Sequence, residues 1–365
     1  MGRQLGWVWF GGRGARIYCV PYLNTAGNQF GIVNTGSNTL TLTTLGANPG
    51  IDYYWFRSVS VGRKVYALPT TRFFGTSDYE FGIIDTDTDT LTITALGLNP
   101  GIDYFWIGVS AVGTRIYCIP SSASAGNLFG IIDTETDTLT LSALGLDDQT
   151  SYRWGVSAAV ATRIYCIPDF NVGANQFGII NTETNTIELT TLGVSLNESH
   201  WWQTIQAVGT KIYCIPYINA KGNLFGIIDT ETNTLTLTTL GADPQKSYRW
   251  ISSASVGTKI YCIPQSISGS TGGTSGGNQF GIIDTETNTL TLTTLGADPA
   301  ISYGWSASAV VDKKIYCIPT LNIFNGGNQF GIIDTETDTL TLTTLGANPQ
   351  DDYRWWSAVV VQPPT

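Results

Sequence analysis

Short runs of β-branched and aromatic residues alternate along the whole chain with clusters of Gly, Pro, Asn and Asp, which is the pattern of strands separated by turns. Four kinds of run recur in a fixed order. The first, as in WSASAVV at 305–311, starts at a tryptophan and is built largely from small residues. The second (KIYCIP, 211–216) and third (FGIID, 225–229) are apolar on both alternating faces, which indicates strands covered on both sides. The fourth (TLTLTTL, 234–240) alternates Leu with Thr, as expected for one buried and one wetter face.

This four-strand unit occurs seven times, at a spacing of about 48 to 55 residues, and occupies nearly all of the 365 residues. We therefore expect a single domain, 1–365, that is an all-β, seven-bladed β-propeller of four-stranded antiparallel blades. A β-solenoid is the alternative, but its coils are usually shorter. The small residues of the tryptophan strand suit the crowded innermost position, and the Leu/Thr strand should be outermost.

The two chain ends suggest how the ring closes. Residues 355–361 repeat the tryptophan strand once more, and we expect them to complete the blade that begins at Ile17. Residues 1–12 would then be a tail or an extra strand. The opposite assignment, with an N-terminal strand closing the ring, remains open.

The units resemble a known repeat. KIYCIPYINAKGNLFGIIDTETNTLTLTTLG, at 211–241, is similar to the YVTN-type propeller repeat in its IDTxTNT hairpin, and more loosely to kelch-like repeats. The resemblance covers all seven units and implies a seven-bladed ring, often on cell surfaces or in binding roles. It implies no particular reaction, because the fold serves many functions.

Charge and composition narrow the function classes. The 18 basic and 28 acidic residues give a net charge of −10, which disfavours nucleic acid as a partner. No apolar run is long enough to insert into a membrane, and the first ten residues do not look like a signal peptide. The compartment stays open between virion-associated, cell-surface and cytoplasmic.

Most connections between strands have constant length, but the one between the second and third strands varies from unit to unit. Binding usually involves such variable loops. The candidate ligand contacts on this loop face are aromatic residues and one arginine; the alternative is that these side chains fold back over the blades. They are Arg72, Phe73, Phe74, Tyr79, Phe170, Tyr217 and Phe324.

A second candidate surface is a ring of tryptophans, one per unit, near the mouth of the central channel. Indole rings there could stack on sugars. The alternative is that each indole packs between adjacent blades. The residues are Trp55, Trp106, Trp154, Trp202, Trp250, Trp305 and Trp355.

The hairpins between third and fourth strands carry an Asp-Thr motif. We expect Asp133, Asp229, Asp284 and Asp334 to cap these turns by accepting backbone hydrogen bonds. Calcium is the alternative at Asp85, Asp87 and Asp89, which match the start of an EF-hand loop but lack its glycine and its final glutamate.

Cysteine and histidine usage disfavours catalysis. Six cysteines share one second-strand position, where equivalent residues of neighbouring blades lie too far apart for disulfides, so we expect buried free thiols and no metal site. His200, the only histidine, takes the place of a repeated tyrosine, which leaves no Ser-His-Asp or Cys-His pair.

The sequence thus favours a non-catalytic propeller, without a cofactor, that binds a glycan or a protein surface. The alternative is a structural subunit of a surface layer, virion or appendage that self-assembles. A propeller-type lyase or hydrolase, using carboxylates alone, ranks third.

Overall fold

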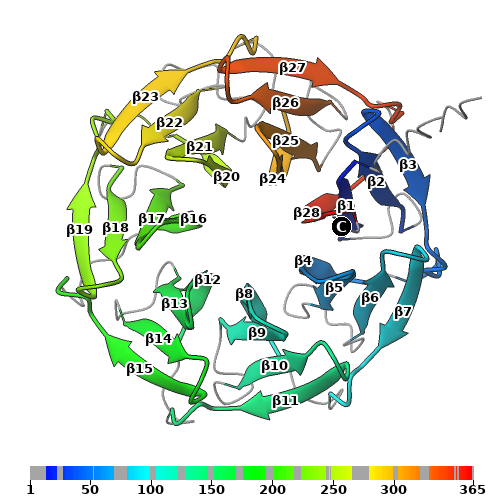
Figure 1. Cartoon of the computed structure of the whole chain (residues 1–365), viewed down its shortest axis with the longest axis horizontal. Coiled ribbons are helices and arrows are strands. Elements are labelled where there is room, and N and C mark those ends of the chain that lie inside the picture. Colours follow the sequence, from blue (N-terminus) through cyan, green and yellow to red (C-terminus); the bar gives the residue numbers. More distant parts are fainter. Residues whose placement is uncertain are drawn as a thin grey trace, which may run out of the picture.

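A computed structural model places the chain as a ring of seven four-stranded antiparallel sheets (Figure 1). It describes residues 14–22, 28–51, 53–69, 80–98, 104–121, 128–146, 152–169, 176–194, 201–217, 223–243, 246, 248–264, 279–298, 303–320, 329–348, 351 and 353–363. All its regular elements within these ranges are strands, and no helix there is long and apolar enough to cross a membrane. The predicted seven-bladed β-propeller is therefore confirmed.

The strands fall into four sets according to their place in the blade. The innermost strands are β4 (Trp55–Val61), β8 (Trp106–Val112), β12 (Trp154–Val160), β16 (Trp202–Val208), β20 (Trp250–Val256), β24 (Trp305–Val311) and β28 (Trp355–Val361). The second strands are β1 (Arg16–Pro21), β5 (Lys64–Pro69), β9 (Arg115–Pro120), β13 (Arg163–Pro168), β17 (Lys211–Pro216), β21 (Lys259–Pro264) and β25 (Lys314–Pro319).

The third strands are β2 (Phe30–Asn34), β6 (Phe81–Asp85), β10 (Phe129–Asp133), β14 (Phe177–Asn181), β18 (Phe225–Asp229), β22 (Phe280–Asp284) and β26 (Phe330–Asp334). The outermost strands are β3 (Thr39–Thr43), β7 (Thr90–Thr94), β11 (Thr138–Ser142), β15 (Thr186–Thr190), β19 (Thr234–Thr238), β23 (Thr289–Thr293) and β27 (Thr339–Thr343). Blade 1 is β28-β1-β2-β3, and blades 2 to 7 follow in chain order from β4. The predicted order within a blade is confirmed.

The C-terminal strand closes the ring. β28 pairs antiparallel with β1, with Arg16 opposite Val361 and Tyr18 opposite Val359. Blade 1 therefore combines both ends of the chain, as predicted for residues 355–361. Residues 1–12, the expected tail or extra strand, lie outside the described residues.

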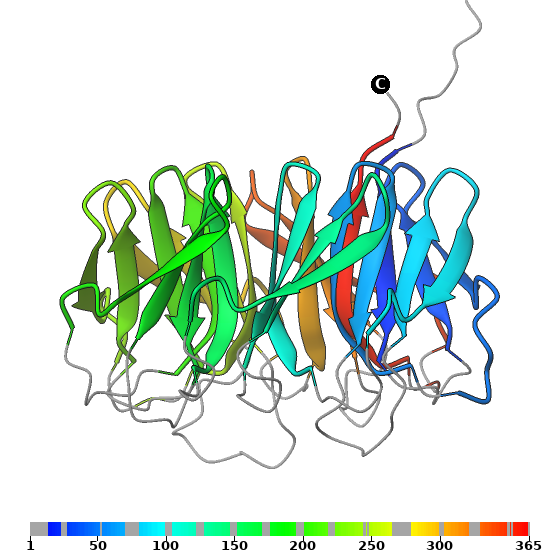
Figure 2. The ribbon, with the colours of Figure 1, turned by 90° about the horizontal axis from the view of Figure 1, so that it is seen from below.

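The ring has two unlike faces (Figure 2). On the turn face, tight turns join the innermost to the second strand and the third to the fourth. On the loop face, the innermost strands begin and the second strands end. The length-variable connections start and finish on this loop face, because each joins the end of a second strand to the start of a third.

Carboxylate caps hold the turn-face hairpins. In blade 5, Asp229 Oδ1 accepts hydrogen bonds from the backbone N–H groups of Glu231 (3.0 Å) and Thr232 (3.1 Å). The bond from Thr232 is the main cause of the lowered pKa of Asp229. The same caps form at Asp133, Asp284 and Asp334, as predicted.

The candidate calcium residues have separate partners. Asp85 caps its own hairpin through Asp87 N–H (2.9 Å) and Thr88 N–H (3.1 Å). Asp87 pairs with Arg63, and Asp89 binds Arg16 of blade 1. These interactions support the capping interpretation, and no group of three or more His, Cys, Asp or Glu in the described ranges is arranged to hold a metal ion.

One hydrogen bond type links every blade to the next. The second-strand tyrosine donates its hydroxyl to the Asn or Asp that ends the hairpin turn of the following blade, as from Tyr213 to Asn288 Oδ1 (2.9 Å). The last blade closes the circle through Tyr316 and Asn38 (3.0 Å). The other pairs are Tyr18–Asp89, Tyr66–Asp137, Tyr117–Asn185, Tyr165–Asn233 and Tyr261–Asp338.

The hydrophobic core consists of seven clusters between blades. The cluster between blades 5 and 6, for example, joins Tyr213, Ile215 and Phe225 of one blade to Trp250 and Ile260 of the next. Because each cluster needs two blades, a blade cannot bury its apolar surface alone.

A leucine with left-handed backbone follows each outermost strand. Leu192 has φ of 50° and is 3% exposed. Its N–H donates a hydrogen bond to Thr190 Oγ1 (3.1 Å), and its carbonyl accepts one from the N–H of Leu235 in the next blade (3.0 Å). These contacts and its buried side chain hold a conformation that costs an L-residue about 1–2 kcal/mol.

The six cysteines are free and buried, as predicted. Burial raises the pKa of each thiol, because a thiolate would lose its hydration. These thiols act as small apolar residues of the blade interfaces.

We expect Leu192→Gly to be less destabilising than Leu192→Ala by about 1 kcal/mol, since both lose the buried side chain but only glycine relieves the backbone. Urea denaturation midpoints measure the difference. The same pair of changes at Leu189, within β15, is the control and should rank in the opposite order, because glycine weakens a strand interior. An Ala variant at 192 as stable as the Gly variant would contradict strain at this position.

The native protein should not react with a thiol reagent such as DTNB, whereas all six thiols should react after unfolding in guanidinium chloride. Absorbance of the released chromophore counts the thiols. Fast reaction of any cysteine in the native protein would show that a blade interface opens.

Candidate functional site

Most of the predicted loop-face contacts, namely Arg72, Phe73, Phe74, Tyr79, Phe170 and Phe324, lie outside the described residues, as does His200. Tyr217 is described. It follows β17 on the loop face, where its ring meets that of Trp201 edge-on at 5.3 Å. Tyr217 N–H donates to the Trp201 carbonyl (3.1 Å), which ties the residue after β17 to the residue before β16.

The repeated tryptophans are core residues. All seven are only 0–4% exposed, which corrects the hypothesis that Trp55, Trp106, Trp154, Trp202, Trp250, Trp305 and Trp355 form a ligand-stacking ring. In blade 6 the indole of Trp250 lies against Gly281 of its own blade and Phe225 of the preceding one, with ring centroids 5.6 Å apart. It also stacks on Tyr248 (4.9 Å) and donates Nε1–H to the Gln279 carbonyl (2.9 Å). No face of the indole is left for a sugar.

A β-bulge immediately after each tryptophan shapes the channel mouth. In blade 2, Trp55 pairs with Pro69 and Arg57 with Leu68, so Phe56 is an extra residue without a partner in the strand ladder. The same shift occurs in all seven innermost strands. A bulge disturbs the alternation of side chains, and consecutive residues, such as Gln203 and Thr204, therefore both line the channel.

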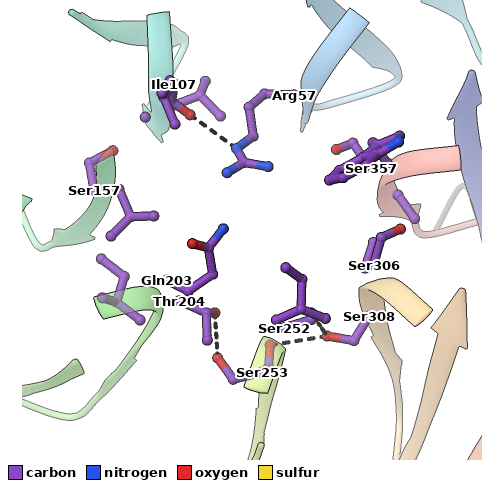
Figure 3. Close-up of a pocket in the computed structure, with 18 residues that line it drawn as sticks. Arg57, Ile107, Ser157, Gln203, Thr204, Ser252, Ser253, Ser306, Ser308 and Ser357 are labelled. Carbon is purple, nitrogen blue, oxygen red and sulfur yellow. Dashed lines mark hydrogen bonds between the residues drawn. The ribbon is translucent and has the colours of Figure 1, made fainter. Parts of the chain in front are cut away.

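The channel holds a cavity of about 220 Å³ that is lined by residues of all seven innermost strands. Much of its wall consists of hydroxyl groups that join neighbouring blades (Figure 3). Thr204 bonds Ser253 (2.7 Å), and Ser252 bonds Ser308 (2.8 Å). These bonds connect innermost strands that belong to separate sheets. The hydroxyl lining therefore has a structural explanation in ring assembly.

Arg57 also bonds the neighbouring blade, but this bond uses only one of its nitrogen atoms and does not account for its charge. Figure 3 shows its guanidinium in the channel, where Nε donates to the Ile107 carbonyl of the next blade (3.0 Å). Arg57 is the single charged residue among those that line the cavity, and none of the ion pairs in the described part of the chain includes it. Burial lowers the pKa of Arg57 to about 10, so it remains a cation at neutral pH.

An aromatic cluster lies beside this cation. Phe56 and Trp356, the bulge residues of blades 2 and 1, are both half-buried, with ring centroids 5.7 Å apart. Tyr22 contacts both rings and also that of Tyr54. The Arg57 guanidinium carbon lies 4.4 Å from the centroid of the Phe56 ring. We call Phe56, Arg57 and Trp356 the mouth triad.

The mouth triad departs from the sevenfold repeat of the innermost strands. At the position of Arg57 the other blades have Gly108, Val156, Thr204, Ser252, Ala307 and Ser357, and at that of Phe56 and Trp356 they have Ile107, Gly155, Gln203, Ile251 and Ser306. This variation along the innermost strands is a usable sequence signal for the site. A comparison of loop lengths alone does not show these residue differences, because they lie within innermost strands of constant length.

Charge differs between the two faces. Exposed acidic residues occupy the turn-face hairpins of blades 2 to 7, as Asp87, Glu135, Glu183, Glu231, Glu286 and Glu336. On the loop face, the residue just before the innermost strand is arginine in three blades: Arg153, Arg249 and Arg354. Three arginines thus lie around the mouth of an acidic molecule, although the turn face also carries basic residues, among them Arg63, Arg115 and Lys211.

Comparison with known proteins bears on the fold alone. No family model matches the chain, and no curated protein matches it, so the YVTN-like resemblance stays a resemblance. The chain is similar in structure to YCF48 bound to D1 peptide (7% identity, TM-score 0.51, covering 79% of this chain and 80% of that one). It is also similar to a putative 6-phosphogluconolactonase from Bacteroides uniformis ATCC 8492 (13% identity, TM-score 0.61, covering 95% of this chain and 99% of that one). A third similar structure is the computationally designed Ika8 protein (9% identity, TM-score 0.54, covering 95% of this chain and 91% of that one).

The adjacent residues Trp355 and Trp356 should respond differently to substitution. We expect Trp355→Ala to destabilise the fold by about 3–5 kcal/mol, because a fully buried indole leaves a cavity. Trp356→Ala should cost far less, since that ring borders the channel. Thermal and urea unfolding measure both, and equal losses would show that Trp356 is a core residue rather than part of a site.

Proposed function

We propose that this chain is a non-catalytic binding propeller whose loop face and channel mouth take a segment of a partner protein. The observation that carries the proposal is the mouth triad. It places two half-buried aromatic rings, and a cation that no ion pair of the described ranges includes, at the centre of a ring that is otherwise nearly repetitive.

Stability alone does not require the triad. Six blades have no arginine at the position of Arg57, and five blades have no aromatic residue at the position of Phe56 and Trp356. Partial burial of a cation without a counter-ion is unfavourable. Aromatic residues and arginine are also the types most enriched at the energetic centres of protein interfaces.

The geometry supports a protein segment better than a glycan. Tyr22 meets Tyr54, Phe56 and Trp356 at interplanar angles of 57° to 77°, and the rings of Phe56 and Trp356 are tilted by 32° to each other. The cluster therefore offers no flat, parallel platform for a sugar. The cavity wall offers hydroxyls, apolar groups, an amide and a guanidinium, but no carboxylate among its lining residues. This lining also supports a role in binding rather than in acid-base chemistry.

Structural likeness adds a precedent. YCF48, which shares the fold at 7% identity, has been solved bound to a peptide. The precedent supports the idea that a propeller of this kind can hold a polypeptide segment. The alternative of a self-assembling structural subunit is an outcome of the following test.

Panning of a random-peptide display library on the full chain, in parallel with a glycan array, tests the proposal. We expect enriched peptides whose binding weakens at least about tenfold in Trp356→Ala, because the exposed part of that ring would be covered by the peptide. Glu231→Ala, on the turn face, is the control and should bind as the parent does.

A saturable signal on the glycan array alone, weakened by Trp356→Ala, would replace the proposal with glycan recognition. Ordered oligomers in solution without peptide or glycan binding would favour the structural role. Either result would overturn the proposal.

A further inference from the structure

We propose that the channel mouth recognises the free C-terminal carboxylate of the partner segment, with Arg57 binding the carboxylate and the last side chain packing on Phe56 and Trp356. The inference rests on the function proposed above and specifies its ligand chemistry.

The charge of the cavity calls for an anion. Arg57 is the single charged group among the lining residues, and its one hydrogen bond within the described ranges uses Nε. The two Nη groups point into the channel (Figure 3). A guanidinium with both Nη groups available is suited to bind two oxygens of one carboxylate.

A second donor lies on another side of the cavity. The side chain of Gln203 projects into the channel from blade 5 (Figure 3). Its Oε1 accepts a hydrogen bond from Trp201 Nε1 (3.3 Å), which leaves the Nε2–H donors for a ligand. The carboxylate would therefore meet donors from both blade 2 and blade 5.

The size of the cavity favours the C-terminal end of the partner's chain over an internal segment of it. At about 220 Å³ it is smaller than the roughly 300–1,000 Å³ of sites that hold drug-sized ligands. A terminal residue has its carboxylate and its side chain on the same atom, so both can enter together. The half-buried rings of Phe56 and Trp356 lie next to Arg57, where an apolar last side chain would be placed.

Three further arginines border the channel mouth. The acidic hairpins are on the turn face, whereas Arg153, Arg249 and Arg354 lie at the starts of innermost strands on the loop face. The Nε atoms of Arg153 and Arg249 are buried and have no hydrogen-bond partner in the described part of the chain. An anion at the mouth would therefore have these three arginines near it.

The test compares peptide ends in a single assay. A peptide enriched by panning is synthesised with a free C-terminus, with an amidated C-terminus, and with an amidated end plus an internal glutamate. N-acetyl-L-phenylalanine and its amide serve as small probes that need no panning. Isothermal titration calorimetry and NMR shift perturbation measure binding to the full chain.

We expect the free carboxylate to bind at least about tenfold more tightly than either amidated peptide, and N-acetyl-L-phenylalanine more tightly than its amide. Arg57→Gln should remove the preference. Arg115→Gln, an exposed turn-face arginine, changes the net charge equally and should keep it. Unfolding midpoints of both variants confirm that the fold is intact.

Equal binding of free and amidated peptides would overturn the inference and leave the proposed protein-binding function standing. A preference for the internal glutamate, or one that survives Arg57→Gln, would also overturn it. Binding of N-acetyl-L-phenylalanine that depends on Arg57, without any peptide binding, would keep the carboxylate site and refute the proposed function. If no probe binds at millimolar concentration, both the carboxylate inference and the proposed protein-binding function are refuted.

Discussion

The contact between each repeated indole and the glycine of the third strand is the constraint on which the rest of the ring depends. A Cβ on Gly226 would lie 2.9 Å from Trp202 Cζ2, so only glycine permits the approach. The indole thereby reaches both sheets: it donates Nε1–H to its own blade, as Trp202 does to the Leu224 carbonyl (2.9 Å), and it packs on Phe177 of the preceding blade. Seven copies of this contact make equal interfaces. The last comes from Trp355, so the ring is complete only when the C-terminal strand docks in blade 1.

The candidate site follows from the same contact. The bulge lies immediately after the tryptophan that is held in the interface, and in several blades the two residues after the tryptophan, such as Gln203 and Thr204, both line the channel. These positions are free of the packing requirements that keep the tryptophan, glycine and phenylalanine constant. They can therefore differ between blades without loss of the ring, and the mouth triad uses this freedom on a scaffold rigid enough to hold it in place.

Polar groups in the channel have two separate roles. The hydroxyls of Ser58 and Ser357, 2.7 Å apart, join the innermost strands of blades 2 and 1, which share no backbone ladder. Such bonds satisfy buried polar groups and contribute to assembly. Arg57 instead adds a partly buried charge that no carboxylate of the cavity wall offsets. This uncompensated charge, which recurs in no other blade, is the reason for proposing Arg57 as part of a binding site.

The sequence by itself determined the blade number, the strand order, the capped hairpins and the free thiols, because each of these depends on short-range patterns of burial and turn residues repeated seven times. It favoured the C-terminal strand for ring closure, and the structure decided between the two chain ends. The sequence left the role of the tryptophans open, since a period of about 50 residues shows that the indoles are equivalent but not what covers them. Only the tertiary structure shows that the indoles are buried between blades and that Phe56, Arg57 and Trp356 lie side by side. The physical reason is ring closure: the channel is formed by seven separate strands, and residues about 300 positions apart become neighbours only when β28 joins β1.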